Sequence, residues 1–139
     1  MQSIENIKLK RNGIEFNIEL KDNMVIINGE SGVGKTILYK ALQAEAKHYD
    51  NEKIICLNYN MPKEGIELLL NNSKGKIIVI DNTEMITSIA QRIKISMDKD
   101  NQYIIFSHTT DGFKPSASSI AELEVENNKG KLCYPLLED

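Results

Sequence analysis

The sequence predicts an α/β fold in which a mainly parallel central sheet is flanked by a β-hairpin at each end of the chain. Three observations predict this fold. Short apolar runs alternate with segments of helical apolar spacing over residues 24–106, the order typical of parallel βαβ units. A glycine-rich loop at residues 29–36 joins the first of these strands to the first helix. Period-two alternation over residues 4–20 and 121–136 predicts the two hairpins.

Residues 4–20 are expected to form the first hairpin. Apolar and polar residues alternate on both sides of Arg11-Asn12-Gly13, and Asn-Gly is a strong signal for a tight two-residue turn. Phe16 has the alternation of a core residue, although it is also the nearest aromatic candidate for contact with a nucleotide base.

Four apolar runs are the expected strands of the central sheet, at residues 24–27, 54–57, 77–80 and 103–106. Helices are expected between them, the first after the glycine-rich loop and the second through Leu70, with Pro62 in its first turn. The third helix is expected from Glu84 to Met97, with Thr83 as its N-cap. Its predicted buried face consists of Met85, Ile86, Ile89, Ile93 and Met97.

Residues 109–119 are rich in Gly, Pro, Ser and Thr and are expected to form a surface loop. Residues 121–136 then alternate around a turn at 127–130, which predicts the second hairpin. Glutamates alternate with apolar residues on its first strand, which predicts an acidic, solvated edge at Glu122, Glu124 and Glu126.

Length and composition predict a single domain over residues 1–139, and the cysteines and the lack of a signal or membrane-spanning run predict a cytoplasmic location. The formal net charge is −3, so no basic surplus supports binding to nucleic acid or to an acidic membrane. Cys56 and Cys133 are isolated and are expected to be reduced. The first residues contain no apolar segment of a secretory signal, and no apolar run reaches membrane-spanning length.

The glycine-rich loop matches the phosphate-binding pattern G-x-x-x-x-G-K-[ST] at every fixed position. It consists of Gly29, Glu30, Ser31, Gly32, Val33, Gly34, Lys35 and Thr36. In this pattern backbone N–H groups and the start of a helix surround phosphate oxygens. Lys35 is expected to bind the β- and γ-phosphates of ATP, and the Thr36 hydroxyl is expected to bind Mg²⁺.

Asp81 ends the most β-prone run of the chain and is the second expected ligand of Mg²⁺. The next residue is Asn82, which has no carboxylate to activate water near neutral pH. Glu84 is the alternative candidate for a catalytic carboxylate, although its place in the first turn of a helix, where acidic residues are favoured, is the simpler reason for it. Ser107 and His108 follow the next strand and are candidates for sensing the γ-phosphate.

These motifs together resemble the additional-strand group of P-loop ATPases, and within it a minimal ATP-binding-cassette or chromosome-maintenance-type domain. The chain also resembles short ATP-binding proteins of bacteria with the same Asp81-Asn82 pair. The resemblance implies a three-layer α/β P-loop NTPase fold with residues 29–36 as Walker A and Asp81 ending Walker B. It also implies that strand 103–106 lies between the strands that precede Gly29 and Asp81. An L-S-G-G-Q-like signature segment is absent from the sequence.

The sequence therefore predicts an ATP-binding protein that acts as a weak or partner-activated, Mg²⁺-dependent ATPase. Arginine occurs only at Arg11 and Arg92, and Arg92 is expected on a solvated helix face. A partner protein or a second copy of the chain would then supply the missing catalytic groups. The alternatives are a non-catalytic switch module that binds ATP and, with less support, a small-molecule or nucleotide kinase.

Overall fold

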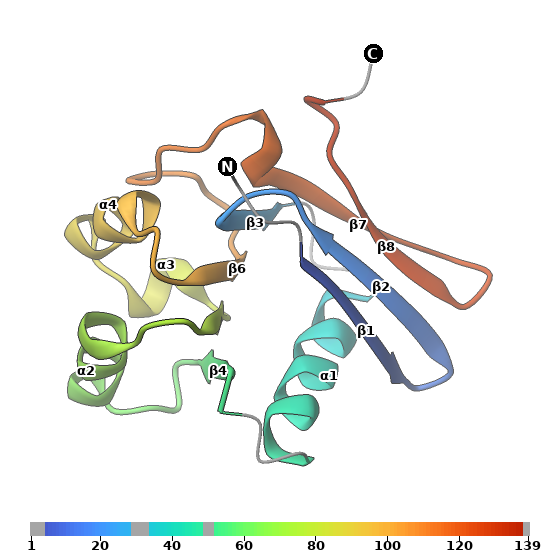
Figure 1. The fold of residues 1–139 in the computed structure, drawn as a ribbon, viewed down its shortest axis with the longest axis horizontal. Helices are drawn as coiled ribbons and strands as arrows, with labels where there is room; N and C mark the ends of the chain where they lie inside the picture. The colour runs from blue at the N-terminus through green and yellow to red at the C-terminus, as the bar shows by residue number, and fades with distance from the viewer. Residues whose placement is uncertain (1–4, 29–33, 49–51, 138–139) are drawn as a thin grey trace.

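The computed structural model describes residues 5–28, 34–48 and 52–137, and these residues form an α/β structure around one mixed eight-stranded sheet (Figure 1). The strands are β1 Glu5–Arg11, β2 Ile14–Leu20, β3 Met24–Asn28, β4 Ile54–Leu57, β5 Ile77–Ile80, β6 Gln102–Phe106, β7 Ile120–Glu126 and β8 Lys129–Cys133. The helices are α1 Lys35–His48, α2 Lys63–Asn72, α3 Thr83–Ile86 and α4 Ile89–Met97, with a 3₁₀ turn at Ala117–Ser119.

The strand order across the sheet is β1-β2-β8-β7-β3-β6-β5-β4. Strands β7, β3, β6, β5 and β4 are parallel to their neighbours in that order, as expected for the central part. The pairs β1–β2 and β7–β8 are antiparallel hairpins, and β2 joins the two hairpins by pairing in parallel with β8. Strand β6 lies between β3 and β5, in the position that the family resemblance implied for it.

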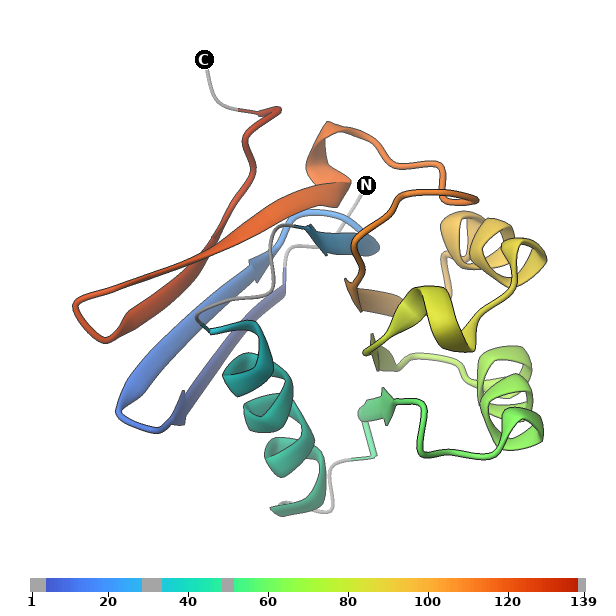
Figure 2. The ribbon, with the colours of Figure 1, turned by 180° about the vertical axis from the view of Figure 1, so that it is seen from behind.

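The sheet curls around helix α1. This helix contacts both β1 and β4, which are the two edge strands of the sheet. Helices α2 and α4 lie on the opposite face, as Figures 1 and 2 show. Each face of the sheet has its own hydrophobic core, and successive side chains of β3 point alternately into the two. Val25 and Ile27 pack with α1, whereas Met24 and Ile26 pack on the side of α2 and α4.

Both predicted hairpins are present. Asn12 and Gly13 have positive φ angles of 52° and 77° and form the first turn, as the primed hairpin turns require. Asn127 and Asn128, at φ 53° and 61°, form the second. The prediction of an acidic edge was wrong, because β7 pairs with β3 on one side and with β8 on the other and is therefore not an edge strand. Its three glutamates are exposed on one face of the sheet.

The predicted helix from Glu84 to Met97 is two helices, α3 and α4. Asn82, in the left-handed conformation, is the N-cap of α3, so the assignment of Thr83 as the cap was wrong. Ser88 begins α4 with a capping box, in which its hydroxyl accepts from the Gln91 amide and its own amide donates to the Gln91 side chain. The break changes the buried face. Met85, Ile89 and Met97 are exposed, whereas Arg92 and Ile95 are buried.

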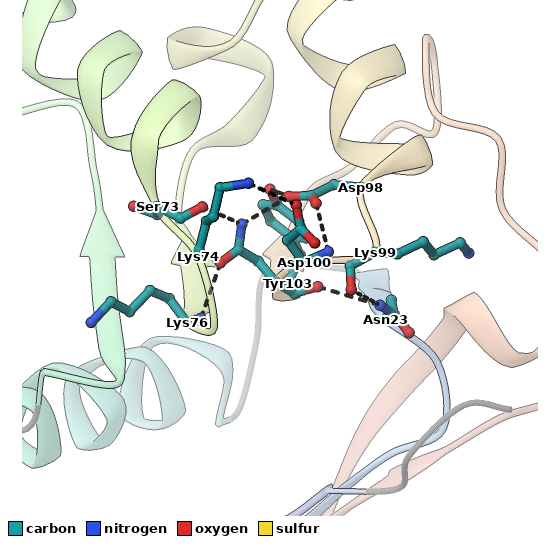
Figure 3. A network of polar contacts seen from close by, with 9 residues as sticks. Asn23, Ser73, Lys74, Lys76, Asp98, Lys99, Asp100 and Tyr103 are labelled. Atoms are coloured by element: carbon teal, nitrogen blue, oxygen red, sulfur yellow. Dashed lines mark hydrogen bonds and ion pairs between the residues drawn. The ribbon is translucent and has the colours of Figure 1, made fainter.

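A polar network lies at the starts of β5 and β6, at the end of these strands that is remote from the start of α1 (Figure 3). The Asn101 side chain donates to Ser73 O and to the Asp98 carboxylate and accepts from the Lys76 amide. The Tyr103 hydroxyl donates to the same carboxylate at 2.5 Å. Burial alone would raise the pKa of Asp98, but the hydrogen bonds from Tyr103, Asn101 and the Asp100 amide hold it below the ordinary value of 3.8.

This network predicts acid-dependent stability. A carboxyl group whose pKa is lowered in the folded state stabilises the fold above its unfolded pKa and loses that contribution as the pH falls through the folded value. We therefore expect Asp98→Asn to reduce the free energy of unfolding most at pH 6–7, and the difference from wild type to shrink below about pH 4. Urea unfolding between pH 3 and 7 measures it. A difference that does not depend on pH would contradict the assignment.

Candidate functional site

A pocket of about 330 Å³ opens where α1 begins and where β5 and β6 end. Its lining residues come from three separate parts of the chain: Lys35, Thr36, Asp81, Asn82, Glu84, Met85, Phe106, Ser107 and His108. The carboxyl ends of neighbouring parallel strands form the usual ligand-binding edge of an α/β sheet. All the site residues that were predicted from the sequence and that the structure describes line this pocket, with one exception. The exception is Gly34, which directly precedes Lys35 in the chain.

Residues 29–33 of the glycine-rich loop lie outside the described residues, so the placement of Gly29, Glu30, Ser31, Gly32 and Val33 stays a prediction. Gly34 is described and has a φ angle of +106°, which a residue with a side chain rarely adopts. A Cβ atom at this position would lie 2.8 Å from Val125 Cγ2 and 3.1 Å from Leu123 Cδ2. Strand β7 thus packs directly against the end of the loop.

Lys35 and Thr36 form the first turn of α1 and face the pocket. Partial burial lowers the pKa of Lys35, and the nearby negative charge of Glu84 acts in the opposite direction. A lysine, a hydroxyl and the first turn of a long helix together suit an anionic ligand, because both the lysine charge and the helix N-terminus attract negative charge.

Asp81 follows β5, and its backbone and side chain are both held in place. Its amide donates to Leu57 O at 3.0 Å, and one carboxylate oxygen accepts from the Asn82 amide at 3.0 Å. Asn82 has a φ angle of 52°. Asparagine tolerates this left-handed conformation better than glutamate does, so the residue after Asp81 has a backbone reason to be Asn.

Glu84 connects the two sides of the pocket. Its carboxylate accepts a hydrogen bond from the His108 amide at 3.2 Å. Ser107 is buried, and its hydroxyl donates to Thr109 O at 2.8 Å, whereas His108 is exposed at the mouth. Glu84 therefore faces the pocket rather than the solvent side of a long helix.

Two residues that contact the pocket lining without being part of it were not predicted from the sequence. Tyr39 on α1 packs edge-on against the ring of Phe106 with centroids 6.0 Å apart, and its hydroxyl accepts from Asn58. Burial raises the pKa of this hydroxyl to about 12, and the charge of Asp81 acts in the same direction. Arg92 is buried, so the prediction of a solvated helix face was wrong. Its position follows from the capping box at Ser88, which is readable in the sequence as S-x-x-Q.

The residues present fit a magnesium ion that is bound together with phosphate groups. Within residues 5–28, 34–48 and 52–137, no cluster of three or more His, Cys, Asp or Glu side chains could hold a metal by itself. Mg²⁺ in nucleotide sites needs only one or two protein oxygens, because waters and phosphates complete its octahedron. Thr36 and Asp81 line the same pocket and are suitable donors.

Strands that end at one edge, a phosphate-loop pattern at that edge and an acidic residue beside it are typical of a nucleoside triphosphatase domain. The chain belongs to the novel STAND NTPase 3 family, nSTAND3, whose model matches residues 16–114. The matched region runs from β2 through the loop that follows β6 and includes every lining residue of the pocket. No curated protein and no solved structure matches the chain. In the described part of the chain, no helix combines the length and apolar character that crossing a membrane requires.

Proposed function

We propose that the chain binds ATP with Mg²⁺ in the pocket at the ends of β5 and β6 and acts as a weak or partner-activated ATPase in the cytoplasm. The observation that carries this proposal is the convergence of Lys35 and Thr36 with Asp81 and with Ser107-His108 on one pocket. Family membership supports the nucleotide-hydrolase part of the proposal. The order β3-β6-β5 supports the finer assignment to the additional-strand P-loop group with a three-layer fold.

Six of the lining residues have a proposed role. Lys35 and the loop at 29–34 bind the phosphates, while Thr36 and Asp81 hold Mg²⁺. The ion supplies positive charge to the phosphate oxygens when it is bound. Glu84 is the proposed acceptor that orients water, and Ser107 and His108 are the proposed contacts to the γ-phosphate.

Slow turnover follows from the residues around Asp81. Asn82 contributes no carboxylate, and Glu84 is hydrogen-bonded to the His108 amide. Neither arginine lines the pocket, since Arg92 is buried in α4 and Arg11 ends strand β1 beside the hairpin turn. A stimulating arginine would therefore come from a partner protein or a second copy of the chain.

A non-catalytic ATP-dependent switch is the second candidate, and Asn82 favours it. In that case the chain would bind ATP in the same pocket and release it unchanged. A small-molecule or nucleotide kinase has less support, because such enzymes close arginine-bearing lids over their two substrates, and neither arginine lies at this pocket.

The proposal predicts slow hydrolysis that depends on Asp81. We expect the isolated chain to hydrolyse ATP below about 1 per second, the lower end of typical enzymes. Asp81→Asn should abolish the effect of Mg²⁺ on ATP binding, because it removes the negative charge of a proposed ligand. Calorimetric titration with ATP, with and without Mg²⁺, and a phosphate-release assay measure both quantities.

The matched control is Asp100→Asn, which removes a carboxylate at the opposite end of the sheet. This variant should bind ATP like wild type and respond equally to Mg²⁺. Binding without phosphate release, alone or with candidate partners, would favour the switch. Failure of the wild-type chain to bind ATP would overturn the proposed function.

A further inference from the structure

Arg92 on α4 is buried, with 6% of its surface exposed, and it contacts the backbone of Glu84, which lines the pocket. Its Nε donates to Thr87 Oγ1 at 2.9 Å and its Nη1 to Asp111 O at 3.1 Å. Its Nη2 donates to Glu84 O at 3.2 Å and to Thr87 O at 3.1 Å. All four acceptors are uncharged oxygens, so the planar guanidinium acts here as a fork of several donors. A buried charge satisfied in this way fixes the backbone positions of its acceptors.

The hydrogen bonds continue from Arg92 to the strands that end at the pocket. The Thr87 hydroxyl, which accepts from Arg92, donates to Thr83 O at 2.6 Å. The Thr83 hydroxyl in turn lies 2.9 Å from Phe106 O and 3.3 Å from Ile80 O. Both threonines are buried. The chain Arg92–Thr87–Thr83 therefore connects α4 to the last residues of β5 and β6.

The loop after His108 is also attached to Arg92. Asp111 supplies one of the four acceptors, and the Phe113 ring centroid lies 6.0 Å from the guanidinium carbon. Gly112 lies against the aliphatic stem, since a Cβ atom there would come within 3.3 Å of Arg92 Cβ. The loop from Thr109 to Phe113 is thus held on the same side chain that holds the carbonyl of Glu84.

These two attachments meet at one hydrogen bond in the pocket. The Glu84 carboxylate accepts from the His108 amide. Arg92 holds Glu84 by its carbonyl and holds the segment after His108 by Asp111 O, so it fixes both partners of this bond without lining the pocket itself.

We propose that Arg92 is a positioning residue of the nucleotide site, and that it acts by setting the placement of Glu84 and His108 relative to each other. This inference rests on the proposed function for its effect on turnover, but its effect on the Glu84–His108 hydrogen bond does not depend on a nucleotide. Small displacements of catalytic groups lower the rate of a reaction steeply. Lys35 and Thr36, the proposed phosphate and Mg²⁺ contacts, lie on a different element, α1, so a change at Arg92 should affect turnover more than ATP affinity.

The test uses the full chain with Arg92→Met, which removes all donors, and Arg92→Lys, which keeps the charge but not the planar fork. Lys94→Met, on the exposed face of the same helix, is the matched control. Glu84→Ala removes the acceptor and so gives the exchange rate of the His108 amide without this hydrogen bond. Amide hydrogen exchange by NMR without nucleotide reports the hydrogen bond. We expect Arg92→Met to speed exchange at His108 by about fivefold, close to Glu84→Ala, with Arg92→Lys in between.

The second readout separates positioning from a purely structural role. We expect Arg92→Met to lower kcat about tenfold or more while the Kd for ATP stays within about threefold of wild type. The proposal would be overturned if Arg92→Met were less stable than wild type but had the same His108 exchange rate and the same kcat as Lys94→Met. If the Arg92 variants do not fold, Thr87→Val should reproduce the effect and Thr87→Ser, which keeps the hydroxyl, should not. If wild type binds no ATP, the proposed function fails alone, and exchange at His108 still decides the role of Arg92.

Discussion

Replacing Lys35 with alanine is expected to weaken ATP binding by about 30- to 100-fold and to leave the fold intact. Lys35 lines the pocket at the first residue of α1, and it is the only lysine or arginine among the described lining residues. Charge-assisted hydrogen bonds contribute about 2–3 kcal/mol, which corresponds to this change in Kd. The side chain is only partly buried, so its removal leaves no core cavity.

Isothermal titration calorimetry with ATP and Mg²⁺ measures this prediction, with circular dichroism as the check on folding. Lys40→Ala is the matched control, because Lys40 is exposed on the same helix and does not line the pocket. The control should bind as wild type does. An unchanged affinity in Lys35→Ala would mean that phosphate is not bound at this loop, and the assignment of the pocket would fail with it.

The parts of the fold that local chemistry determines were predicted correctly from the sequence. Asn12-Gly13 supplies two positive φ angles, which a two-residue hairpin turn needs. The run 77–80 became β5 with all four residues buried, as a parallel strand covered on both faces requires. The place of β6 between β3 and β5 came from family resemblance rather than from any local pattern.

The break between α3 and α4 shows where periodicity misleads. Apolar residues recur at helical spacing from Met85 to Met97, but a helix must also satisfy its terminal N–H groups. Ser88 and Gln91 do so as a capping box and start a new helix at Ile89. The new helix turns Arg92 and Ile95 inward and leaves Met97 exposed. The capping residues, rather than the apolar spacing, therefore determine where the helix begins.

The pocket residues were predictable because short motifs place them at strand and helix ends, where a parallel sheet brings them together. The groups that hold them in position were not, because their contacts join distant parts of the chain. Arg92 reaches Asp111 O, and Leu123 and Val125 pack against Gly34. Such contacts depend on where the tertiary fold places β7 and the loop after His108 relative to the pocket. No local sequence pattern predicts that placement.

The contact between Gly130 and Phe16 is another long-range contact and gives the largest expected effect on stability. Gly130 on β8 pairs with Phe16 on β2, and a Cβ atom at Gly130 would lie 2.5 Å from Phe16 Cδ1. Phe16 is 2% exposed, and its ring covers the glycine on the neighbouring strand. We therefore expect Gly130→Ala to lower the free energy of unfolding by about 1–3 kcal/mol, the usual effect of overpacking a core.

Urea unfolding of three further variants isolates the cause. Gly65→Ala, where a new Cβ atom meets nothing within 4 Å, should leave stability unchanged or raise it by up to about 1 kcal/mol, because alanine favours helix α2. Phe16→Leu combined with Gly130→Ala should lose less stability than the two single changes summed, because the smaller side chain makes room for the methyl group. Strictly additive losses would show that the ring does not set the requirement for glycine. A favourable coupling would instead show that the Phe16 ring and the glycine at position 130 depend on each other where β2 joins the two hairpins into a single sheet.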